Sequence, residues 1–569
     1  MKRAGLVTAA LVAAVAVWAW SLPPRRVTLV PSFDDGTVRG LLHVHSRLSD
    51  GMGTADEIAA AAARAGLKFI VLTDHGDGTR RPEPPAYREG VLVLDGVEIS
   101  TRGGHYVAIG LPQSPYALGG DPADVVEDVR RMHGFGIVAH PDSPKAELRW
   151  ADWSAPFDGI ELINPDTSWR VRATGDGYGG KWLLMWSLLA YPTRPAEAIT
   201  QLLTDTRSLS DRWTAMLADR KVVAVAGADA HAKLQFVDRD PGDNRFSVSI
   251  PSYTASFESL SVHIRPSTPF SGDAQADAGR LIDGLRAGAV FVAVDGWASP
   301  AAFEFSATSG PTRSIEGGTI EPSAPVLLHV RSNAPTGFRT IVRKGLDTLV
   351  ERTDTAFDVP VGQDAATYSV EIRRDAASGP AWVISNPIYV GERRPRATVT
   401  PPTPGRAVRS LFDGRTLGGW SRESDAVSAA TLDLVQFVQG LMLHMRYGLA
   451  GGTPVGQFAA AAVDTDGGVA GTTGVAFRVR ASADMRVAVM VRAEVPGAAP
   501  ERWERSVFVS PTDTERVVRF ADMTPVGPTH SLRAPLAGVR SVLFVIDTTN
   551  SKPGASGQLW LGDVRLVRE

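Results

Sequence analysis

The chain contains no cysteine. This absence excludes disulfide bonds, thiolate metal sites, a cysteine nucleophile and a lipid anchor on cysteine. A strong excess of one charge is also missing, because 62 acidic residues stand against 59 basic ones and the net charge is −3. Without a basic field, we expect no nucleic-acid partner. Because cysteine is absent, any bound metal must be held by histidine and carboxylate side chains.

The composition is that of an ordinary globular protein. Of the 569 residues, 44% are hydrophobic and 21% are charged, which excludes a mostly disordered chain and a membrane protein with many spans. At roughly 150 residues per domain, the length suggests about three or four domains.

One long apolar run lies at the N-terminus. Residues 4–22 carry no charge and are flanked by basic pairs at 2–3 and 25–26. A cleaved signal has an apolar stretch of about 7–15 residues, whereas a spanning helix needs about 17–25. Residues 1–30 are therefore interpreted as a signal-anchor or a signal peptide. The body of the protein is expected to be exported, and either tethered to a membrane by this helix or released into the periplasm or outside the cell.

The rest of the chain divides by its patterning. Residues 37–298 alternate short apolar runs with helical patterns, which predicts parallel β/α units. Within them, a tryptophan-rich insertion at about 145–215 could form a helical cover, a lid or a substrate wall. Short strands over 299–392 predict a β-sandwich. A proline-rich linker over 393–409 then leads to a jelly-roll-like β domain over 410–569.

The chemistry is expected where histidines gather. Seven of the eleven histidines lie between positions 43 and 231, mostly at the ends of predicted strands and beside carboxylates. The carboxyl ends of parallel strands are where such folds build their sites, and residues two apart on a strand point to the same face. The candidate metal ligands are His43, His45, Asp50, His75, Glu98, His105, His140, Asp229 and His231.

Nine ligands are too many for one tetrahedral ion, so two or three divalent cations are expected. Imidazole and carboxylate ligands favour Zn, Mn or Fe over Ca²⁺. Such a cluster lowers the pKa of a bridging water and clamps an anionic substrate. The sequence therefore predicts hydrolysis of esters or amides, phosphoesters above all. The remaining histidines are interpreted as structural; they are His133, His263, His329, His444 and His530.

The ordered motifs resemble the PHP (polymerase and histidinol phosphatase) superfamily over residues 37–298. They read His43-Val-His45-Ser-Arg-Leu-Ser-Asp50-Gly, Thr-Asp-His75, Gly-Val-Glu98, Gly-His105, Ala-His140-Pro and Gly-Ala-Asp229-Ala-His231. The stretches at 281–294 and 385–389 are similar to the branch that includes carbaryl-type hydrolases, which carries a C-terminal β extension.

This resemblance implies a distorted (β/α)7 TIM-like barrel with a trinuclear site at the carboxyl ends of its strands. The first metal would be held by His43, His45, Glu98 and Asp229. Glu98 would bridge to a second metal, shared with His105 and His140. Asp50, His75 and His231 would hold the third. A hydroxide between metals would be the nucleophile, so Glu98, Asp229 and His231 are the residues expected to act in catalysis.

Three cations lie near the predicted ligands. Arg47, Arg102 and Lys145 are expected either to bind the phosphate of a small anionic substrate or to be solvated loop charges. The predicted function is that of a metal-dependent phosphoesterase. The alternatives are hydrolysis of a carbamate or amide at the same site, and a non-catalytic exported protein that binds a ligand or sugar. The ending at 559–566 resembles sugar-binding jelly rolls, so the C-terminal domain could contact carbohydrate, although structural support or protein contact is the favoured role.

Overall fold

The structure is a computed structural model. It describes residues 12, 15–235, 245, 247–375, 379–391, 402–438, 440–452, 456–495, 497 and 499–569. The chain forms two compact units. Unit 1 comprises Met1–Gly76, Pro82–Pro112 and Val129–Ala397, and unit 2 comprises Asp77–Arg81, Gln113–Asp128 and Thr398–Glu569.

The predicted N-terminal helix over residues 4–22 lies in large part outside the described residues. Of this run, Val12 and residues 15–21 are seen as helix. Among the residues that the structure describes, no helix has both the length and the apolar character needed to cross a membrane.

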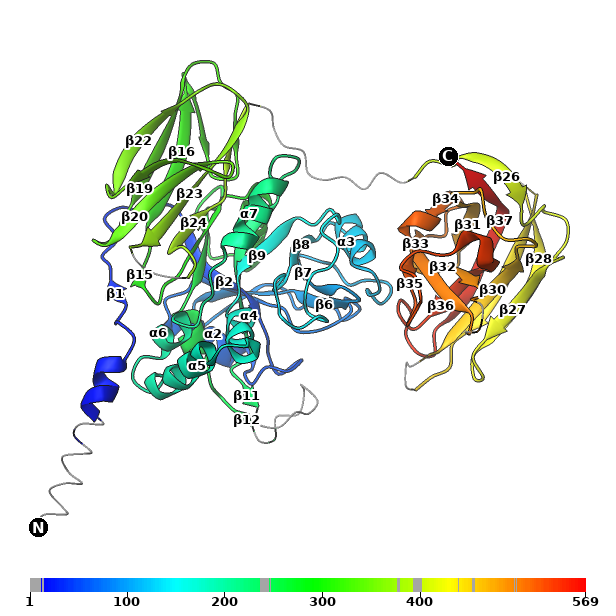
Figure 1. Ribbon diagram of the computed structural model, residues 1–569, viewed down its shortest axis with the longest axis horizontal. Coiled ribbons are helices and arrows are strands. Elements are labelled where there is room, and N and C mark those ends of the chain that lie inside the picture. Colours follow the sequence, from blue (N-terminus) through cyan, green and yellow to red (C-terminus); the bar gives the residue numbers. More distant parts are fainter. Residues whose placement is uncertain are drawn as a thin grey trace, which may run out of the picture. The chain divides into compact units, whose positions relative to one another are not determined.

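Unit 1 is built around a closed barrel of strands (Figure 1). Its main strands are β2 (Val38–Val44), β3 (Phe69–Leu72), β5 (Val91–Asp95), β6 (Val97–Thr101), β7 (Gly104–Ile109), β8 (Phe135–Val138), β9 (Gly159–Ile163) and β10 (Val223–Ala230). The pairings β2–β3, β3–β5, β8–β9, β9–β10 and β10–β2 are parallel. Strand β7 pairs antiparallel with both β6 and β8. The barrel is therefore mixed, and the (β/α)7 TIM-like form stays a prediction.

Helices of unit 1 follow local sequence signals. Helix α2 (Ala55–Arg64) begins with a capping box formed by Thr54 and Glu57, which satisfies free N–H groups of the first turn. Helix α9 (Ala274–Ala287) ends at Gly288, whose φ of 67° suits glycine. The other helices are α4 (Pro165–Thr174), α5 (Tyr178–Ala190), α6 (Pro195–Thr200), α7 (Arg207–Met216) and α8 (Tyr253–Phe257), while α3 (Pro122–Arg131) has its first residues in unit 2.

The region predicted as a tryptophan-rich insertion is not one uninterrupted cover. It contains the barrel strand β9, which pairs with β8 and β10, and the helices α4 to α7 follow it. Two further details also differ from the sequence prediction. Glu98 lies not at the end of a strand but within β6, which Gly96 separates from β5, and the predicted linker ends in strand β26 (Arg406–Ser410).

The smaller strands of unit 1 either join the sheet of the barrel or form separate sheets. They are β1 (Val27–Thr28), β4 (Ala86–Arg88), β11 (Leu234–Gln235), β12 (Ser247–Val248), β13 (Ser261–Ile264), β14 (Val290–Ala293) and β15 (Ala298–Ser299). They also include β16 (Phe303–Ser309), β17 (Thr312–Ile315), β18 (Thr319–Ile320), β19 (Val326–Ser332), β20 (Phe338–Lys344), β21 (Asp347–Arg352), β22 (Ala356–Val361), β23 (Ala366–Arg374), β24 (Val383–Ser385) and β25 (Ile388–Val390). Strand β24 pairs with β14, which joins it to the sheet of the barrel.

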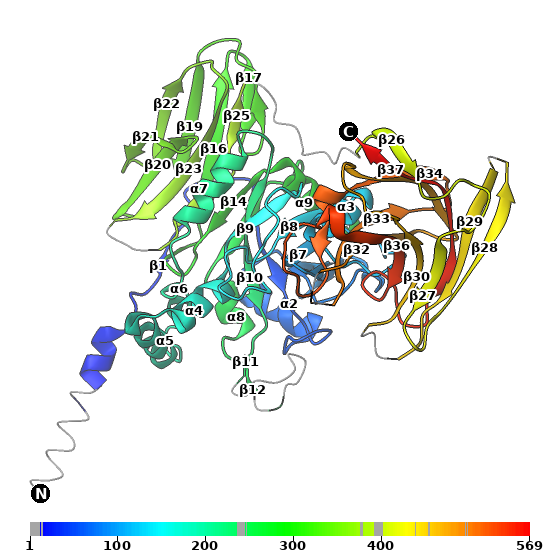
Figure 2. The ribbon, with the colours of Figure 1, turned by 45° about the vertical axis from the view of Figure 1, so that its right-hand side comes forward.

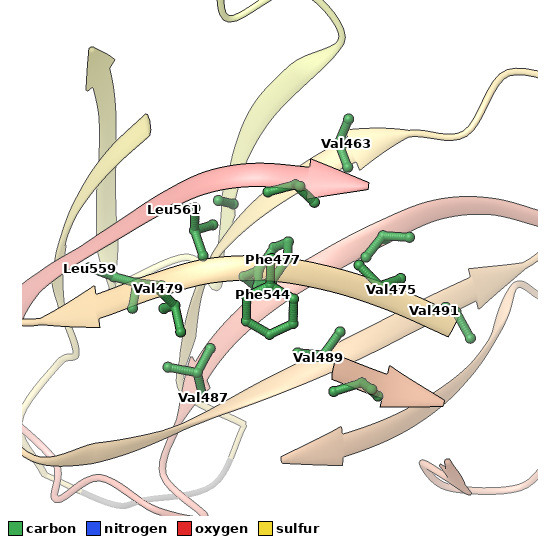
Figure 3. Close-up of a cluster of buried hydrophobic side chains, with 14 of the residues drawn as sticks. Val463, Val475, Phe477, Val479, Val487, Val489, Val491, Phe544, Leu559 and Leu561 are labelled. Atoms are coloured by element: carbon green, nitrogen blue, oxygen red, sulfur yellow. The ribbon is translucent and has the colours of Figure 1, made fainter. Parts of the chain in front are cut away.

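Unit 2 is a sandwich of two six-stranded sheets. Besides β26, they contain β27 (Trp420–Ser424), β28 (Ala429–Phe437), β29 (Gly440–Gly448), β30 (Phe458–Asp464), β31 (Gly474–Ala481), β32 (Met485–Ala493), β33 (Glu501–Val509), β34 (Thr514–Arg519), β35 (Thr524–Pro525), β36 (Val539–Asp547) and β37 (Ser556–Arg568). Alternate residues of β31 and β32 meet in the core, where the rings of Phe477 and Phe544 cross edge to face with centroids 4.9 Å apart (Figure 3). This alternation is what the two-residue period of a strand requires.

Candidate metal centre

The nine predicted ligands come together at one end of the barrel. Their ligand atoms form four groups, within each of which every atom lies within 4.8 Å of the others. The groups are His43, His45 and Asp229; His43, Glu98 and His140; His75, Glu98 and His105; and His45, Asp50, His75 and His231. Every predicted ligand belongs to at least one group, and each group is large enough to hold a metal ion.

Glu98 is the centre of this arrangement. Its side chain on β6 is 1% exposed. Its Oε2 lies 3.2 Å from one ring nitrogen each of His43, His45 and His75. Its Oε1 lies 2.8 Å from His105 Nδ1 and 3.0 Å from His140 Nε2. One carboxylate thus faces five imidazoles, three through one of its oxygens and two through the other.

Two more carboxylates flank this centre. Asp229 Oδ1 lies 3.4 Å from Nε2 of both His43 and His45. Asp50 Oδ1 lies 3.2 Å from His231 Nε2, and its Oδ2 lies 3.7 Å from His75 Nε2. The carboxylates therefore alternate with the imidazoles across the whole cluster.

The cluster fits metal ions because some of its polar atoms have no other partner. Nε2 of His43 and of His45 are both buried and make no hydrogen bond. Such orphaned atoms are costly unless something else satisfies them. Both point at Glu98 Oε2 and Asp229 Oδ1, so a cation among these four atoms would satisfy them together.

The carboxylates of the cluster raise the pKa of His43 and His45, and the histidines lower the pKa of Glu98. Burial alone would lower the pKa of His43, but Glu161, Asp229 and Glu98 raise it well above its usual value. Burial likewise works against a raised pKa of His45, yet the nearby carboxylates of Asp229 and Glu98 bring that pKa to about 10. The same partners act in reverse on the acid: although burial favours the neutral form of Glu98, the surrounding histidines hold its pKa well below the usual range.

His75 and His140 respond differently to the same carboxylate. Burial is the main cause that lowers the pKa of His75. Burial also disfavours the charged form of His140, but the hydrogen bond to Glu98 raises the pKa of that side chain to about 9. Without metal, the cluster therefore carries protons that a cation must displace.

Backbone strain lies at three of the ligands. His43, His140 and Asp229 have φ values of 62°, 30° and 47°, in the left-handed region that residues other than glycine rarely adopt. The pairings of β2 with β3 and with β10 also shift register near His43 and Asp229. The sequence predicted that His43 and His45 share one face of a regular strand, and the strained backbone shows that they do not form such a regular pair. Their rings nevertheless lie 5.2 Å apart.

Sequence reasoning missed Glu161, a buried carboxylate on β9. Its Oε1 accepts a hydrogen bond from His43 Nδ1 at 2.6 Å, and its Oε2 accepts from the backbone N–H of His140 at 2.8 Å and from Asn164 Nδ2 at 2.9 Å. It thereby directs His43 Nε2 towards the cluster, as a carboxylate behind a ligating histidine does. The signal was present as one acid within the apolar run at 159–163.

A second missed carboxylate, Asp74, shapes the loop that carries Asp50. Asp74 accepts hydrogen bonds from the backbone N–H of Ser46, from Ser46 Oγ and from Ser49 Oγ, at 2.6 to 2.8 Å. Asp50 follows Ser49 directly in this loop. Asp74 therefore helps to fix the position of Asp50.

The three predicted substrate-binding cations lie on exposed loops. Arg47 donates to the carbonyl of Met52 and pairs with Glu57, and Lys145 pairs with Glu147. Arg102 is also exposed. Arg47 in addition lines a cavity of about 200 Å³ with the neighbouring Ser46, and none of the nine predicted ligands lines this cavity. Their role in binding substrate stays a prediction.

Arg170 on α4 is a cation that the sequence prediction did not include. Burial lowers the pKa of Arg170, but its hydrogen bond to Asp166 and the charges of Asp166 and Asp229 raise it overall. The charge of Asp229 therefore acts on this guanidinium, whose ion-pair partner is Asp166.

The other histidines lie apart from the cluster. His263 contacts Thr37, His329 pairs with Asp358, His444 pairs with Asp433, and His530 pairs with Glu501. None of these, nor His133, belongs to a metal-binding group among the described residues. In unit 2, the ring of Trp560 on β37 stacks on His444 of the neighbouring strand β29. The guanidinium of Arg480, on the other neighbouring strand β31, lies over the same ring. Carbohydrate contact by this domain stays a prediction.

Comparison with known proteins gives partial similarities. No family model matches the chain. Over 125 residues it is 37% identical to the 3',5'-nucleoside bisphosphate phosphatase of Chromobacterium violaceum, a match that covers 20% of this chain and 43% of the phosphatase. Over 141 residues it is 27% identical to an uncharacterized protein of Methanocaldococcus jannaschii, covering 22% of this chain and 80% of that protein. The chain therefore spans less than half the length of the phosphatase.

Solved structures are similar at a low level. A family 11 carbohydrate-binding module from Clostridium thermocellum matches with a TM-score of 0.24 and 13% identity, over 28% of this chain and 95% of the module. The agarase AgWH50C matches with a TM-score of 0.21 and 11% identity, over 29% of this chain and 25% of the agarase. These scores are too low to indicate a shared ligand. What stands is a partial likeness to a phosphatase in a chain whose His, Asp and Glu side chains form groups that could bind metal ions.

Proposed function

We propose that this chain is a metal-dependent hydrolase that cleaves phosphoesters. The observation that carries the proposal is the convergence of six histidines and three carboxylates on Glu98 and its neighbours at one end of the barrel. Divalent cations bound there supply a water of lowered pKa and positive charge opposite an anionic substrate. The partial likeness to a bisphosphate phosphatase supports the same reaction class.

The chain's own residues would prepare this site in three ways. Glu161 accepts a hydrogen bond from Nδ1 of His43, and the carbonyl of Leu148 accepts one from Nδ1 of His140. Each ring therefore presents Nε2 to the cluster. The carbonyl of Asp229 does the same for His231. These contacts select the tautomer that can bind a cation.

The division of the ligands among metals is part of the proposal. We assign His43, His45, Glu98 and Asp229 to a first cation, with Glu98 shared by a second at His105 and His140. Asp50, His75 and His231 would hold a third. The positions of His105 and His140 against Glu98 Oε1 support the shared role of this carboxylate. In this reading the barrel is of the PHP type, and Arg47 and Arg170 are the cations proposed to meet the substrate's phosphate.

The test is a panel of phosphomonoester, phosphodiester and carbamate substrates, each with added Mn²⁺ or Zn²⁺. A matched pair of variants serves as control, because His140 and His263 are equally buried, both 3% exposed. We expect phosphoester cleavage that is lost in His140→Gln and kept in His263→Gln. Cleavage of carbamates alone would replace the proposed substrate class. Inactivity on the whole panel with metal fully loaded would favour a binding protein.

A further inference from the structure

The two helices α4 and α5 carry an exposed apolar surface in unit 1. We define this apolar face by Trp169, Tyr178, Trp182, Met185, Leu188 and Leu189, all of which are exposed large hydrophobic side chains. Trp182 is 56% exposed and Tyr178 is 81% exposed. Large contiguous apolar patches are uncommon on proteins that contact only water, and they mark surfaces for a partner or a membrane.

Helix α5 buries few of its side chains against unit 1. Its only buried side chains are Ser187 and Ala190. Ser187 Oγ accepts a hydrogen bond from Gln201 Nε2 at 2.8 Å, which joins α5 to the residues after α6. A helix that packs on a protein core turns its apolar stripe towards that core. Here the two buried residues are small, while the large apolar side chains of α5 are exposed or half-buried, so the apolar face is presented to something outside unit 1.

The N-terminal apolar run meets this same face. Trp18 Nε1 donates a hydrogen bond to the carbonyl of Leu189 at 3.2 Å, and Figures 1 and 2 both show the N-terminal helix next to α5. Residues 4–22 form an uncharged run of a length suited to a bilayer. The apolar face is thus continuous with the one segment of the chain whose composition fits lipid.

The residue types of the surface fit the boundary between lipid and water. Trp169, Tyr178 and Trp182 have the amphipathic rings that concentrate at membrane interfaces, and Lys181 lies among them on α5. We propose that the apolar face docks onto the surface of the lipid bilayer that receives the N-terminal segment. An interfacial helix buries its apolar side roughly 5–10 Å into the headgroup boundary.

The absence of cysteine allows a direct test. A single fluorophore at Leu188→Cys reports on the apolar face, and one at Leu346→Cys, in the turn between β20 and β21, is its control. The two leucines are matched, with exposures of 50% and 54%. Full-length variants are placed in vesicles of phosphatidylethanolamine and phosphatidylglycerol, after their metal content is shown to equal that of the unsubstituted protein.

We expect iodide to quench the label at position 188 severalfold less than the label at 346, and brominated lipid to quench only the former. Equal iodide quenching at both positions would overturn the proposal. Protection from iodide without quenching by brominated lipid would also overturn it, because the cover would then be protein: a second copy of the chain or its own N-terminal segment.

Discussion

At the scale of the residue, Glu161 tests whether the carboxylate behind His43 matters for metal binding. Glu161→Gln keeps the shape of the side chain but removes the charge that accepts the Nδ1 proton of His43 at 2.6 Å. Loss of such an outer partner typically weakens metal affinity by roughly 10–100-fold. We expect a loss of this size, measured by competition with a chelating dye.

A buried carboxylate outside the cluster provides the control for Glu161. Asp295 is fully buried and bonds Arg39 at 2.8 Å. Asp295→Asn should lower the stability of the protein without changing its metal affinity. If both variants lost metal to the same extent, the effect would be one of general destabilisation, and the positioning role of Glu161 would be abandoned.

The pH dependence of stability follows from the raised histidine pKa values. His43, His45 and His140 bind protons more tightly in the folded, metal-free protein than when unfolded, and the pKa values of His45 and His140 are about 10 and about 9. The stability that they contribute is full below the unfolded value of about 6.5 and is lost as pH rises through the folded values. Bound metal replaces these protons and removes this loss.

We therefore expect the melting temperature of the metal-free protein to fall as the pH rises from neutral through the pKa values of His140 and His45, about 9 and about 10. The melting temperature of the metal-loaded protein should stay nearly level over the same range. Differential scanning calorimetry of both forms measures the widening gap. Two curves that run parallel across this range would contradict the assignment of protons to these three side chains.

The sequence allowed the nine candidate ligands to be named but not the residues behind them. Each candidate lies within a short motif, such as His43-Val-His45 or Ala-His140-Pro. Glu161 belongs to no motif, and Asp74, although it lies in the Thr-Asp-His75 motif, was given no role of its own. Their role depends on which strands become neighbours, and only the fold determines that.

At the scale of the element, strand β9 shows where pattern reasoning stops. Its five residues lie between a proline-rich stretch and the start of α4, and the surrounding tryptophans favoured a helical cover. The strands β2, β3 and β8 could be predicted from their apolar runs. The irregular backbone of His43 and Asp229 could not, because it follows from register shifts between strands.

Gly227 on β10 makes room for Glu161. A Cβ at this glycine would lie 1.9 Å from Glu161 Oε1, a distance at which one of the two must move. Gly227→Ala should therefore displace Glu161, and we expect it to weaken metal binding as Glu161→Gln does, without adding to the loss in the double variant. Isothermal titration with Zn²⁺ measures the three affinities.

Gly279 is the matched control for Gly227. It lies within α9, and a Cβ there meets nothing within 4 Å. Gly279→Ala should leave metal affinity unchanged and raise stability by about 1 kcal/mol, since alanine favours a helix. Additive losses in the Gly227 and Glu161 double variant would indicate that the glycine acts by another route.

At the scale of the whole molecule, the division into two units was the part that sequence reasoning predicted least well. Residues 113–128 lie within the predicted barrel region, yet they belong to unit 2 with the C-terminal sandwich. The reason lies in Arg486 on β32, which is fully buried and pairs with Asp124, Glu127 and Asp128 at 2.7 to 3.3 Å. A single arginine in a strand gives no sign of partners more than 350 positions away.

Arg486→Gln should destabilise unit 2 strongly. It removes the buried charge that pairs with both Asp124 and Asp128, and breaking a buried ion pair costs about 3–5 kcal/mol. Arg492 on the same strand pairs with Glu423 but is 28% exposed, so Arg492→Gln should cost at most about 1 kcal/mol. Urea unfolding followed by tryptophan fluorescence compares them. Equal costs would contradict the special weight given to Arg486.

The most direct test of the metal centre is the metal content of the purified protein, measured by elemental analysis after saturation with Mn²⁺ or Zn²⁺ and removal of the excess. Nine converging ligands should hold about two to three divalent ions per chain. Because Glu98 faces five of the histidines, Glu98→Ala should lose metal from two positions and abolish turnover. An unsubstituted protein that retains no metal, or a Glu98→Ala variant with unchanged content, would contradict the polymetallic site.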